Sequence, residues 1–296
     1  MAIVDVINDI WNRYDLPGSR NPAPAVAVMR MRGTIGSGPM SRSGLSLASL
    51  EGAIKRAFSK RVRAVCVVIN SPGGSPVQSA QIAAMIRQLS QEKKIPVFAF
   101  TEDVAASGGY WLALAADEIY ADAMSVVGSI GVITQSFGFQ ELIAKLGVER
   151  RVYTQGTRKG MLDPFRAEDP EDIKRLYEIQ ADIHRQFIAF VKQRRGDRLS
   201  KNDELLFNGD IWTGERALEL GLVDGLGDLR TIVRRKYGPD VRFINIERPA
   251  GWLQRRFGRF LPSDVGAAVE HGVAGGWAGD LMAAVEERAL WSRFGL

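Results

Sequence analysis

The chain has 296 residues, of which 46% are hydrophobic and 25% are charged, values that are ordinary for a soluble globular protein. A net charge of +5 over this length is too small to indicate nucleic acid as a partner, and no stretch interleaves basic with aromatic residues as an RNA-binding surface does. The single cysteine, Cys66, can form neither an intramolecular disulfide nor a thiolate metal cluster, and its apolar surroundings indicate an inert core thiol.

The N-terminal sequence indicates no targeting signal, because it lacks the basic start and the long apolar stretch of a secretory signal peptide. No run reaches the ~18 uncharged apolar residues of a membrane helix, and the nearest, residues 104–116, is too short. We therefore expect a cytoplasmic protein, with a peripheral contact at the inner membrane face as the one membrane role left open.

Apolar periodicity and turn residues predict the elements in chain order. The expected helices cover residues 3–12, 47–58, 76–91, 105–115, 139–146, 170 to about 195, 215–220 and 228–237. The expected strands cover residues 25–31, 62–69, 96–100, 118–121, 130–134, 151–153 and 242–246. This alternation of strand and helix predicts an α/β layered domain with a mostly parallel sheet.

Composition divides the chain into three parts: an N-terminal helical arm and linker over 1–24, a layered domain over 25–248, and a helical C-terminal tail over 249–296. In the tail, Arg255, Arg256 and Arg259 oppose apolar side chains at helical spacing. A helix of this kind suits an anionic membrane surface, a contact between subunits or packing on the core, and these readings stay open.

A candidate nucleophile, Ser107, lies in an apolar run that ends in Gly108 and Gly109, and Tyr110 and Trp111 are expected to shape an apolar groove beside it. A serine hydroxyl attacks only when a nearby base takes its proton. The two histidines do not suit this role. His184 falls in the middle of a predicted helix beside apolar residues, and His271 falls in the tail, so both are read as structural.

Lysine can replace histidine as the base when its amine is neutral, which requires the ordinary lysine pKa of about 10.4 to fall by burial. Lys159 is a candidate because glycines flank its segment and Met161, Leu162 and Phe165 follow it. A solvated surface lysine is the alternative reading.

A tetrahedral intermediate also needs two backbone N–H donors with no side chain in the way, which glycine permits. Gly73 or Gly74, directly after a predicted strand, supplies one candidate donor, and Gly108 supplies the second. The alternatives are an ordinary turn at the first pair and close helix packing at the second. Their joint occurrence after neighbouring strands favours a site, because ligands bind where loops leave the strand ends of such sheets.

Five segments resemble, in the same order, the signal peptide peptidase A family of serine peptidases, which share the fold of the Clp protease subunit and the crotonases. These segments are Asn70–Gly74, Ala106–Tyr110, Gly128–Val132, the Lys159 segment through Phe165, and Trp212–Gly214 with Gly221–Asp224. The likeness covers roughly residues 25 to 245, so the resemblance implies a Clp protease/crotonase-like peptidase domain over 25–248.

The resemblance implies a Ser-Lys dyad, with Ser107 as nucleophile and Lys159 as general base. It assigns Ser129 to a hydroxyl that orients the lysine, and Gly74 and Gly108 to the oxyanion donors, with the Gly73 amide as the competitor for the first. The family also implies ring-like homo-oligomers in which residues sometimes cross between subunits. The expected function is a serine endopeptidase that cleaves hydrophobic or signal-peptide-like peptides through an acyl-enzyme.

Two alternatives from other classes remain. A crotonase-like acyl-CoA enzyme would use the same glycines with carboxylates, for which Glu102 and Asp103 are the candidates. A catalytically silent scaffold would bind peptides or membrane partners through the tail. Neither a metal nor an organic cofactor is expected, because the chain has no ligand cluster of suitable spacing and no phosphate-loop lysine pattern.

Overall fold

The computed structural model describes residues 23–36, 44–59, 61–156, 158–246 and 288–295. The helix expected over 3–12 and most of the predicted tail lie outside these ranges, and of the tail the structure describes a short helix over residues 288–292 and the turn after it. Within the described ranges, no helix is long and apolar enough to cross a membrane. The predicted contact with a membrane face therefore stays a prediction, as does the division into three parts.

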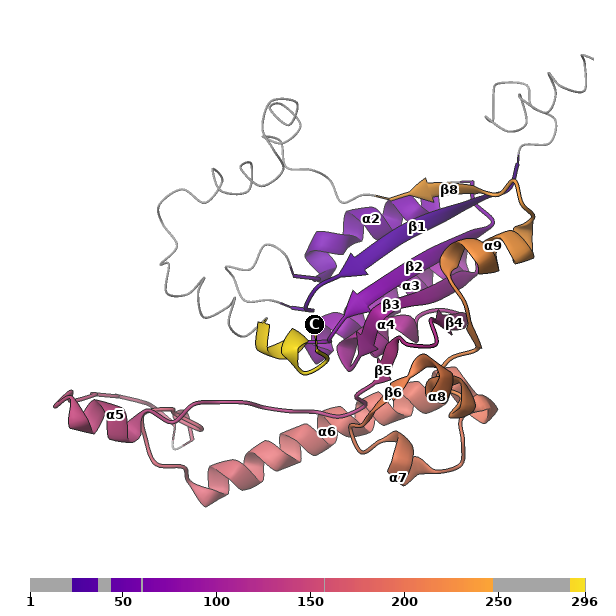
Figure 1. The fold of residues 1–296 in the computed structure, drawn as a ribbon. Coiled ribbons are helices and arrows are strands. Elements are labelled where there is room, and N and C mark those ends of the chain that lie inside the picture. Colours follow the sequence, from indigo (N-terminus) through magenta and orange to yellow (C-terminus); the bar gives the residue numbers. More distant parts are fainter. Residues whose placement is uncertain (1–22, 37–43, 60, 157, 247–287, 296) are drawn as a thin grey trace, which may run out of the picture.

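One eight-stranded sheet organises the molecule, with the strand order β6-β5-β3-β2-β1-β8 and with β4 and β7 joined beside β3. The strands are β1 (Ala25–Arg32), β2 (Ala64–Ser71), β3 (Val97–Ala106), β4 (Glu118–Ala121), β5 (Val126–Gly128), β6 (Ile211–Thr213), β7 (Gly225–Leu226) and β8 (Arg242–Asn245). All pairings are parallel except that of β5 with β6. The predicted α/β layered class with a mostly parallel sheet is confirmed (Figure 1).

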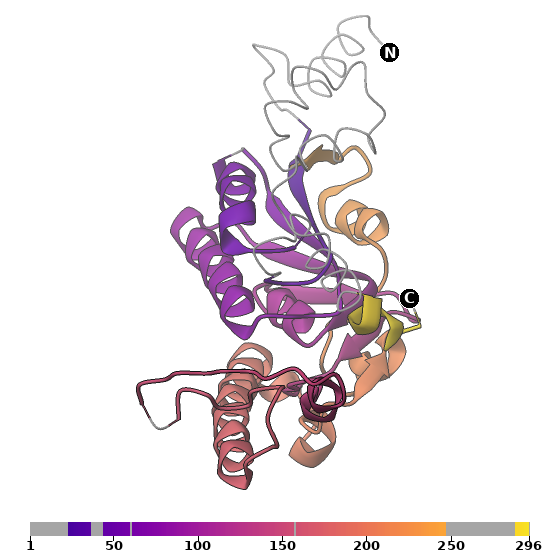
Figure 2. The same ribbon diagram turned by 90° about the vertical axis from the view of Figure 1, so that its left-hand side faces the viewer.

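Helices cover both faces of the sheet: α2 and α3 lie on one side and α9 on the other (Figure 2). The helices are α2 (Leu47–Ser59), α3 (Pro76–Lys93), α4 (Gly108–Ala113), α5 (Gln140–Lys145), α6 (Pro170–Arg195), α7 (Asp203–Leu206), α8 (Gly214–Glu219) and α9 (Leu229–Tyr237). A parallel sheet covered on both faces explains why all eight residues of β2 are buried.

Alternate side chains of each central strand enter different cores, because successive residues of a strand point to opposite faces. In β2, Val65 and Val67 pack with the residues of α2 and α3, whereas Cys66 and Val68 pack with Ile232 of α9. Burial raises the pKa of the Cys66 thiol to about 12, which agrees with the predicted inert role.

A long excursion, which we call the arm (residues 132–169), leaves the sheet after β5 and carries α5 (Figure 1). The arm ends at Asp169, whose side chain accepts a hydrogen bond from the Glu171 amide and so caps the start of α6. Helix α6 then runs back toward the sheet, where Phe187 and Val191 are buried. The arm thus projects from the layered core and is joined to it at one end by the segment after β5 and at the other by α6.

Three predicted elements differ from the structure. The helix expected from residue 105 begins at Gly108, because β3 continues through Ala106. Residues 130–134 form no strand, since positive φ angles at Gly128 and Ser129 turn the chain out of the sheet. Residues 151–153 lie in the arm without a partner strand, and an unpaired segment cannot form a ladder.

Candidate active site

Ser107 occupies the junction between β3 and α4 in a backbone conformation that non-glycine residues rarely adopt, with φ 52° and ψ −121°. Its amide donates to the Gly128 carbonyl of β5 at 2.8 Å, which ties the turn to the neighbouring strand. A serine on a strained strand-to-helix turn has its hydroxyl presented at the end of the sheet. The side chain is half-buried and lines a cavity of about 710 Å³.

The glycines around Ser107 are required by close packing. A Cβ on Gly73 would lie 2.8 Å from the Ser107 Cβ, and a Cβ on Gly74 would lie 2.1 Å from the Ile35 carbonyl oxygen. A Cβ on Gly108 would lie 2.5 Å from the Ser79 Oγ. The alternative interpretation, that Gly108 is needed for close packing, is thus also correct. Close packing at the Cα of Gly108 leaves its amide available to bind a ligand.

The amides of the three predicted oxyanion residues differ in their hydrogen bonds. The Gly73 amide donates to the Ser71 Oγ at 3.3 Å. Within the part of the chain that the structure describes, the amides of Gly74 and Gly108 donate to no acceptor. Both glycines line the Ser107 cavity, and a Cβ on Gly108 would lie 3.3 Å from the Gly74 nitrogen. Two unused donors therefore lie next to the candidate nucleophile.

One wall of the cavity is apolar and comes mainly from α4 and α6. The Trp111 ring stacks on Phe187 with 4.8 Å between ring centroids, and Ile183 and Val132 line the same space. The predicted groove role of Trp111 fits this wall. The same prediction for Tyr110 is wrong, because its side chain is fully buried and donates to the Leu222 carbonyl at 2.7 Å.

Ser129 also lines the cavity, and its backbone is held on both sides. Its φ is 51°, its amide donates to the Asp210 carbonyl at 2.7 Å, and its carbonyl accepts from the Gly131 amide at 2.9 Å. The residue is 8% exposed. Its hydroxyl has no hydrogen-bond partner among the described residues, so it is free to bind a group that enters the cavity.

His184 lies in the wall of the same cavity, which the sequence interpretation missed. The Nε2 atom lies 3.1 Å from the Ile130 carbonyl oxygen, one residue beyond Ser129. The helical spacing of His184 with Gln180 and Phe187 was the available signal, because residues three and four apart share one helix face. That face borders the site.

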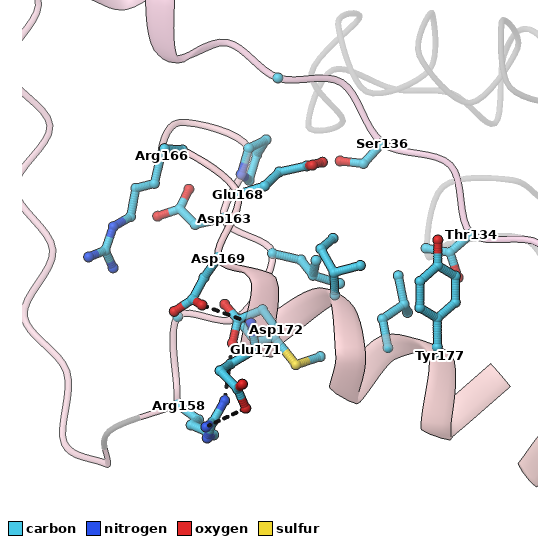
Figure 3. Close-up of a pocket in the computed structure, with 18 of the residues that line it drawn as sticks. Thr134, Ser136, Arg158, Asp163, Arg166, Glu168, Asp169, Glu171, Asp172 and Tyr177 are labelled. Carbon is cyan, nitrogen blue, oxygen red and sulfur yellow. Dashed lines mark hydrogen bonds and ion pairs between the residues drawn. The ribbon is translucent and has the colours of Figure 1, made fainter. Parts of the chain in front are cut away.

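Lys159 lies elsewhere. It is exposed in the arm and is not among the residues that line the Ser107 cavity, so this chain does not bring the predicted dyad together. The neighbouring Arg158 lies 3.6 Å from an oxygen of Asp172 and 3.9 Å from one of Glu171 (Figure 3). These contacts border a second cavity, of about 940 Å³, between the arm and the start of α6.

The carboxylates of the acyl-CoA alternative also lie away from Ser107. Glu102 forms an ion pair with Arg30, and Asp103 accepts from the Asn70 amide group at 2.6 Å. Both line a third cavity, which does not include Ser107. No carboxylate side chain is among the described residues that line the Ser107 cavity, so the carboxylate-based enolate chemistry of the alternative has no support there.

A partly buried ion cluster connects α6 with the loop that follows α8. Asp224 accepts from Arg195 at 2.7 Å, from Arg198 at 2.8 Å and from the Ile119 amide at 2.7 Å. Burial works against the charged carboxylate, but these donors outweigh it and lower the pKa of Asp224. The cluster fixes α6, and with it the α6 wall of the cavity.

A hydroxyl on a strained turn with two unused amides beside it is the arrangement of a serine hydrolase. Comparison with known proteins narrows this class, because the profile of peptidase family S49 matches residues 89–238, just over half of the chain. The chain belongs to peptidase family S49. The predicted resemblance to a family of serine peptidases is confirmed at the level of the family.

Two curated relatives illustrate the match. The Na(+)/H(+) antiporter NhaA of Brucella abortus (strain 2308) is 49% identical over 276 residues, covering 92% of this chain and 37% of that protein. The chloroplastic serine protease SPPA of Arabidopsis thaliana is 31% identical over 241 residues, covering 76% of this chain and 35% of that protein. The chain thus spans little more than a third of the length of these relatives.

Among solved structures, a mutant of the 1510-N membrane-bound stomatin-specific protease aligns with a TM-score of 0.47 at 18% identity. The alignment covers 77% of this chain and 99% of that one.

Proposed function

We propose that the protein is a serine endopeptidase that cleaves peptides through an acyl-enzyme on Ser107. The observation that carries the proposal is the placement of Ser107 on a strained turn, in a cavity lined by Gly74 and Gly108, whose amides have no acceptor among the described residues. Membership of a peptidase family supports the same reaction class.

The reaction starts when the Ser107 hydroxyl attacks the scissile carbonyl and its proton passes to a neutral Lys159 amine. The Gly74 and Gly108 amides donate to the oxyanion that forms. Gly73 is the weaker candidate, because its amide already donates to the Ser71 hydroxyl. The lysine returns the proton to the leaving amine and then activates the water that hydrolyses the acyl-enzyme.

We propose that Lys159 acts on the Ser107 cavity of a second copy of the chain. The lysine is exposed in its own chain, in an arm that also exposes large apolar side chains. These side chains are 44% to 90% exposed and include Phe137, Leu142, Leu146, Val148, Val152 and Tyr153. A contact between copies would bury them and would take the Lys159 amine out of water, which favours its neutral form.

The apolar wall favours peptides with hydrophobic side chains next to the scissile bond. Trp111 and Phe187 offer stacked aromatic surface, and Ile183 and Val132 extend it. Cleaved signal peptides have this character, and a sequence-matched series with leucine or aspartate beside the scissile bond tests the preference. We expect the leucine peptide to be cleaved faster, because an aspartate beside Trp111 and Phe187 would be desolvated against apolar side chains.

Mixing two inactive variants tests the shared site. We expect Ser107→Ala and Lys159→Ala each to abolish cleavage of a hydrophobic peptide while the thermal midpoint stays near that of the wild type. In a one-to-one mixture of refolded chains, sites that combine intact Ser107 with intact Lys159 should restore about a quarter of the wild-type activity.

The possible results separate the hypotheses. Mixtures that stay inactive, although both variants assemble, would place the base in the same chain. Full activity of Lys159→Ala would overturn the dyad, and turnover of an acyl-CoA thioester by Ser107→Ala would favour the crotonase-like alternative. A wild-type protein that neither cleaves peptides nor reacts with a peptide aldehyde would support a silent scaffold.

A further inference from the structure

The segment after β5 needs a support that backbone hydrogen bonds do not provide. Gly128 and Ser129 both have positive φ angles, so the chain leaves the sheet abruptly at the point where Ser129 enters the cavity wall. The Ser129 amide and carbonyl are engaged, by the Asp210 carbonyl and the Gly131 amide respectively. The next carbonyl, that of Ile130, accepts from a side chain instead.

That side chain is His184, and we propose that it is a positioning residue of the active site. Its Nε2–H holds the Ile130 carbonyl and thereby fixes the Ser129 hydroxyl where it can orient the base lysine. The inference rests on the proposed mechanism, because it assigns His184 an effect on the Ser107–Lys159 reaction through Ser129 alone.

The protonation of His184 follows from its partner. A carbonyl oxygen only accepts, so the Nε2 atom at 3.1 Å must carry the hydrogen. A nitrogen that donates to the Ile130 carbonyl cannot take the Ser107 proton at the same time. The described structure also contains no hydrogen bond from Ser107 to His184. The geometry therefore points to support of the loop and not to proton transfer.

Helix α6 ties the loop at two points one helical turn apart. Gln180 donates to the Thr134 hydroxyl at 3.0 Å, four residues further along the loop than Ile130. Only the His184 bond adjoins Ser129, and Phe187, on the same helix face, is buried against the core. Gln180 is therefore a matched control: it also joins α6 to this segment but lies further from the hydroxyl.

The test compares three single variants in steady-state cleavage of a hydrophobic peptide. His184→Leu removes the donor, and we expect kcat to fall about 10-fold with little change in KM, the scale of one lost hydrogen bond in the transition state. His184→Gln keeps an N–H of similar reach, and we expect it to recover most of kcat. Gln180→Leu should stay within about 2-fold of the wild type.

A double-mutant cycle with Ser129→Ala separates positioning from general damage. If His184 acts through the Ser129 hydroxyl, His184→Leu should cost nothing further once that hydroxyl is gone. If the two substitutions lower kcat multiplicatively in the double variant, the proposal is overturned. Full activity of His184→Leu would also overturn it. Loss of activity in His184→Gln as complete as in Ser107→Ala would make His184 the base and would overturn it too. If Ser107→Ala remained active, the proposed function itself would fail, whatever the His184 variants showed.

Discussion

Gly73 shows how a single missing Cβ shapes the site. A methyl group there would lie 2.8 Å from the Ser107 Cβ and 2.9 Å from the Gly108 nitrogen, between the nucleophile and one of the two unused amides. The φ of Gly73 is 108°, so any other residue is strained as well. The position therefore carries two separable costs, one for the backbone and one for the reacting groups.

We expect Gly73→Ala to lower kcat about 100-fold, because displacing reacting groups by about 1 Å has effects of that size. Gly238→Ala is the matched control: the φ of Gly238 is 95°, and a Cβ there would meet nothing within 4 Å. Both variants should lose stability in urea unfolding because of the positive φ, Gly73→Ala the more because its Cβ also clashes, and only Gly73→Ala should lose peptidase activity. Equal activity losses would show that backbone strain alone explains the effect.

At the same scale, the sequence predicted that Ser107 lies beside Gly74 and Gly108, but it did not predict the residues that surround them. Glycine pairs after predicted strands show where the backbone must approach closely, and this is a local property. The place of His184 beside the cavity and the burial of Tyr110 were not predicted, because tertiary packing decides which face of a helix borders a cavity. The role proposed for Lys159 depends on a second copy of the chain, which no pattern in a single chain describes.

Helix α6 is the element that joins the core to the site. Its last turn holds the buried Arg195, whose side chain is 2% exposed and bonds Asp224. Its middle turns supply Ile183, His184 and Phe187 to the cavity wall. Loosening the Asp224 cluster would therefore disturb the wall as well as the fold.

The cluster predicts a specific acid sensitivity. The pKa of Asp224 is lowered in the folded state, so its stabilisation is fully present above the unfolded-state value of about 3.9 and is lost as pH falls through the folded-state pKa. We expect Asp224→Asn to lower the free energy of unfolding by about 3 kcal/mol at pH 7 and by much less near pH 2. Urea unfolding across this pH range measures the difference.

Asp182 provides the control on the same helix. It pairs with Arg185 at 2.9 Å, but both side chains are about two-thirds exposed, so Asp182→Asn should cost less than about 1 kcal/mol at any pH. Equal pH dependence in the two asparagine variants would show that the Asp224 cluster is not the source of the acid sensitivity.

Elements with a clear apolar pattern in their own sequence were predictable. Elements whose bounds depend on pairing with another strand were not. Strand β2 and helices α2, α3 and α6 follow from apolar runs and caps within their own sequence. Residues 130–134 are as apolar as a strand, yet positive φ angles just before them remove the segment from the ladder. The boundary of β3 and α4 shifted because Ala105 and Ala106 pair with β5, a strand too short to recognise.

At the scale of the whole molecule, the arm carries large apolar side chains that are exposed to solvent. Leu146 is 68% exposed and Phe137 is 67% exposed, which is unfavourable for a chain that works alone. If the arm joins copies, a charge there should separate them without unfolding the core, because these side chains bury little within one chain.

We expect Leu146→Glu to reduce the mass measured by light scattering and to lower peptidase activity together, since each site would lose the Lys159 of its neighbour. Met124→Glu is the control, because Met124 is 85% exposed but lies outside the arm. The specific activity of the wild type should also fall on dilution, as for any site shared between chains. An active, monomeric Leu146→Glu would contradict the shared site.

The cavity wall has one further source, in Leu290 and Arg293, which come long after β8 in the sequence. During synthesis, the serine, its glycines and the α6 wall all leave the ribosome before these two residues do. Until they emerge, the Ser107 cavity lacks the part of its wall that these two residues form. The order of residues along the chain therefore sets the order in which the parts of the cavity wall become available during synthesis.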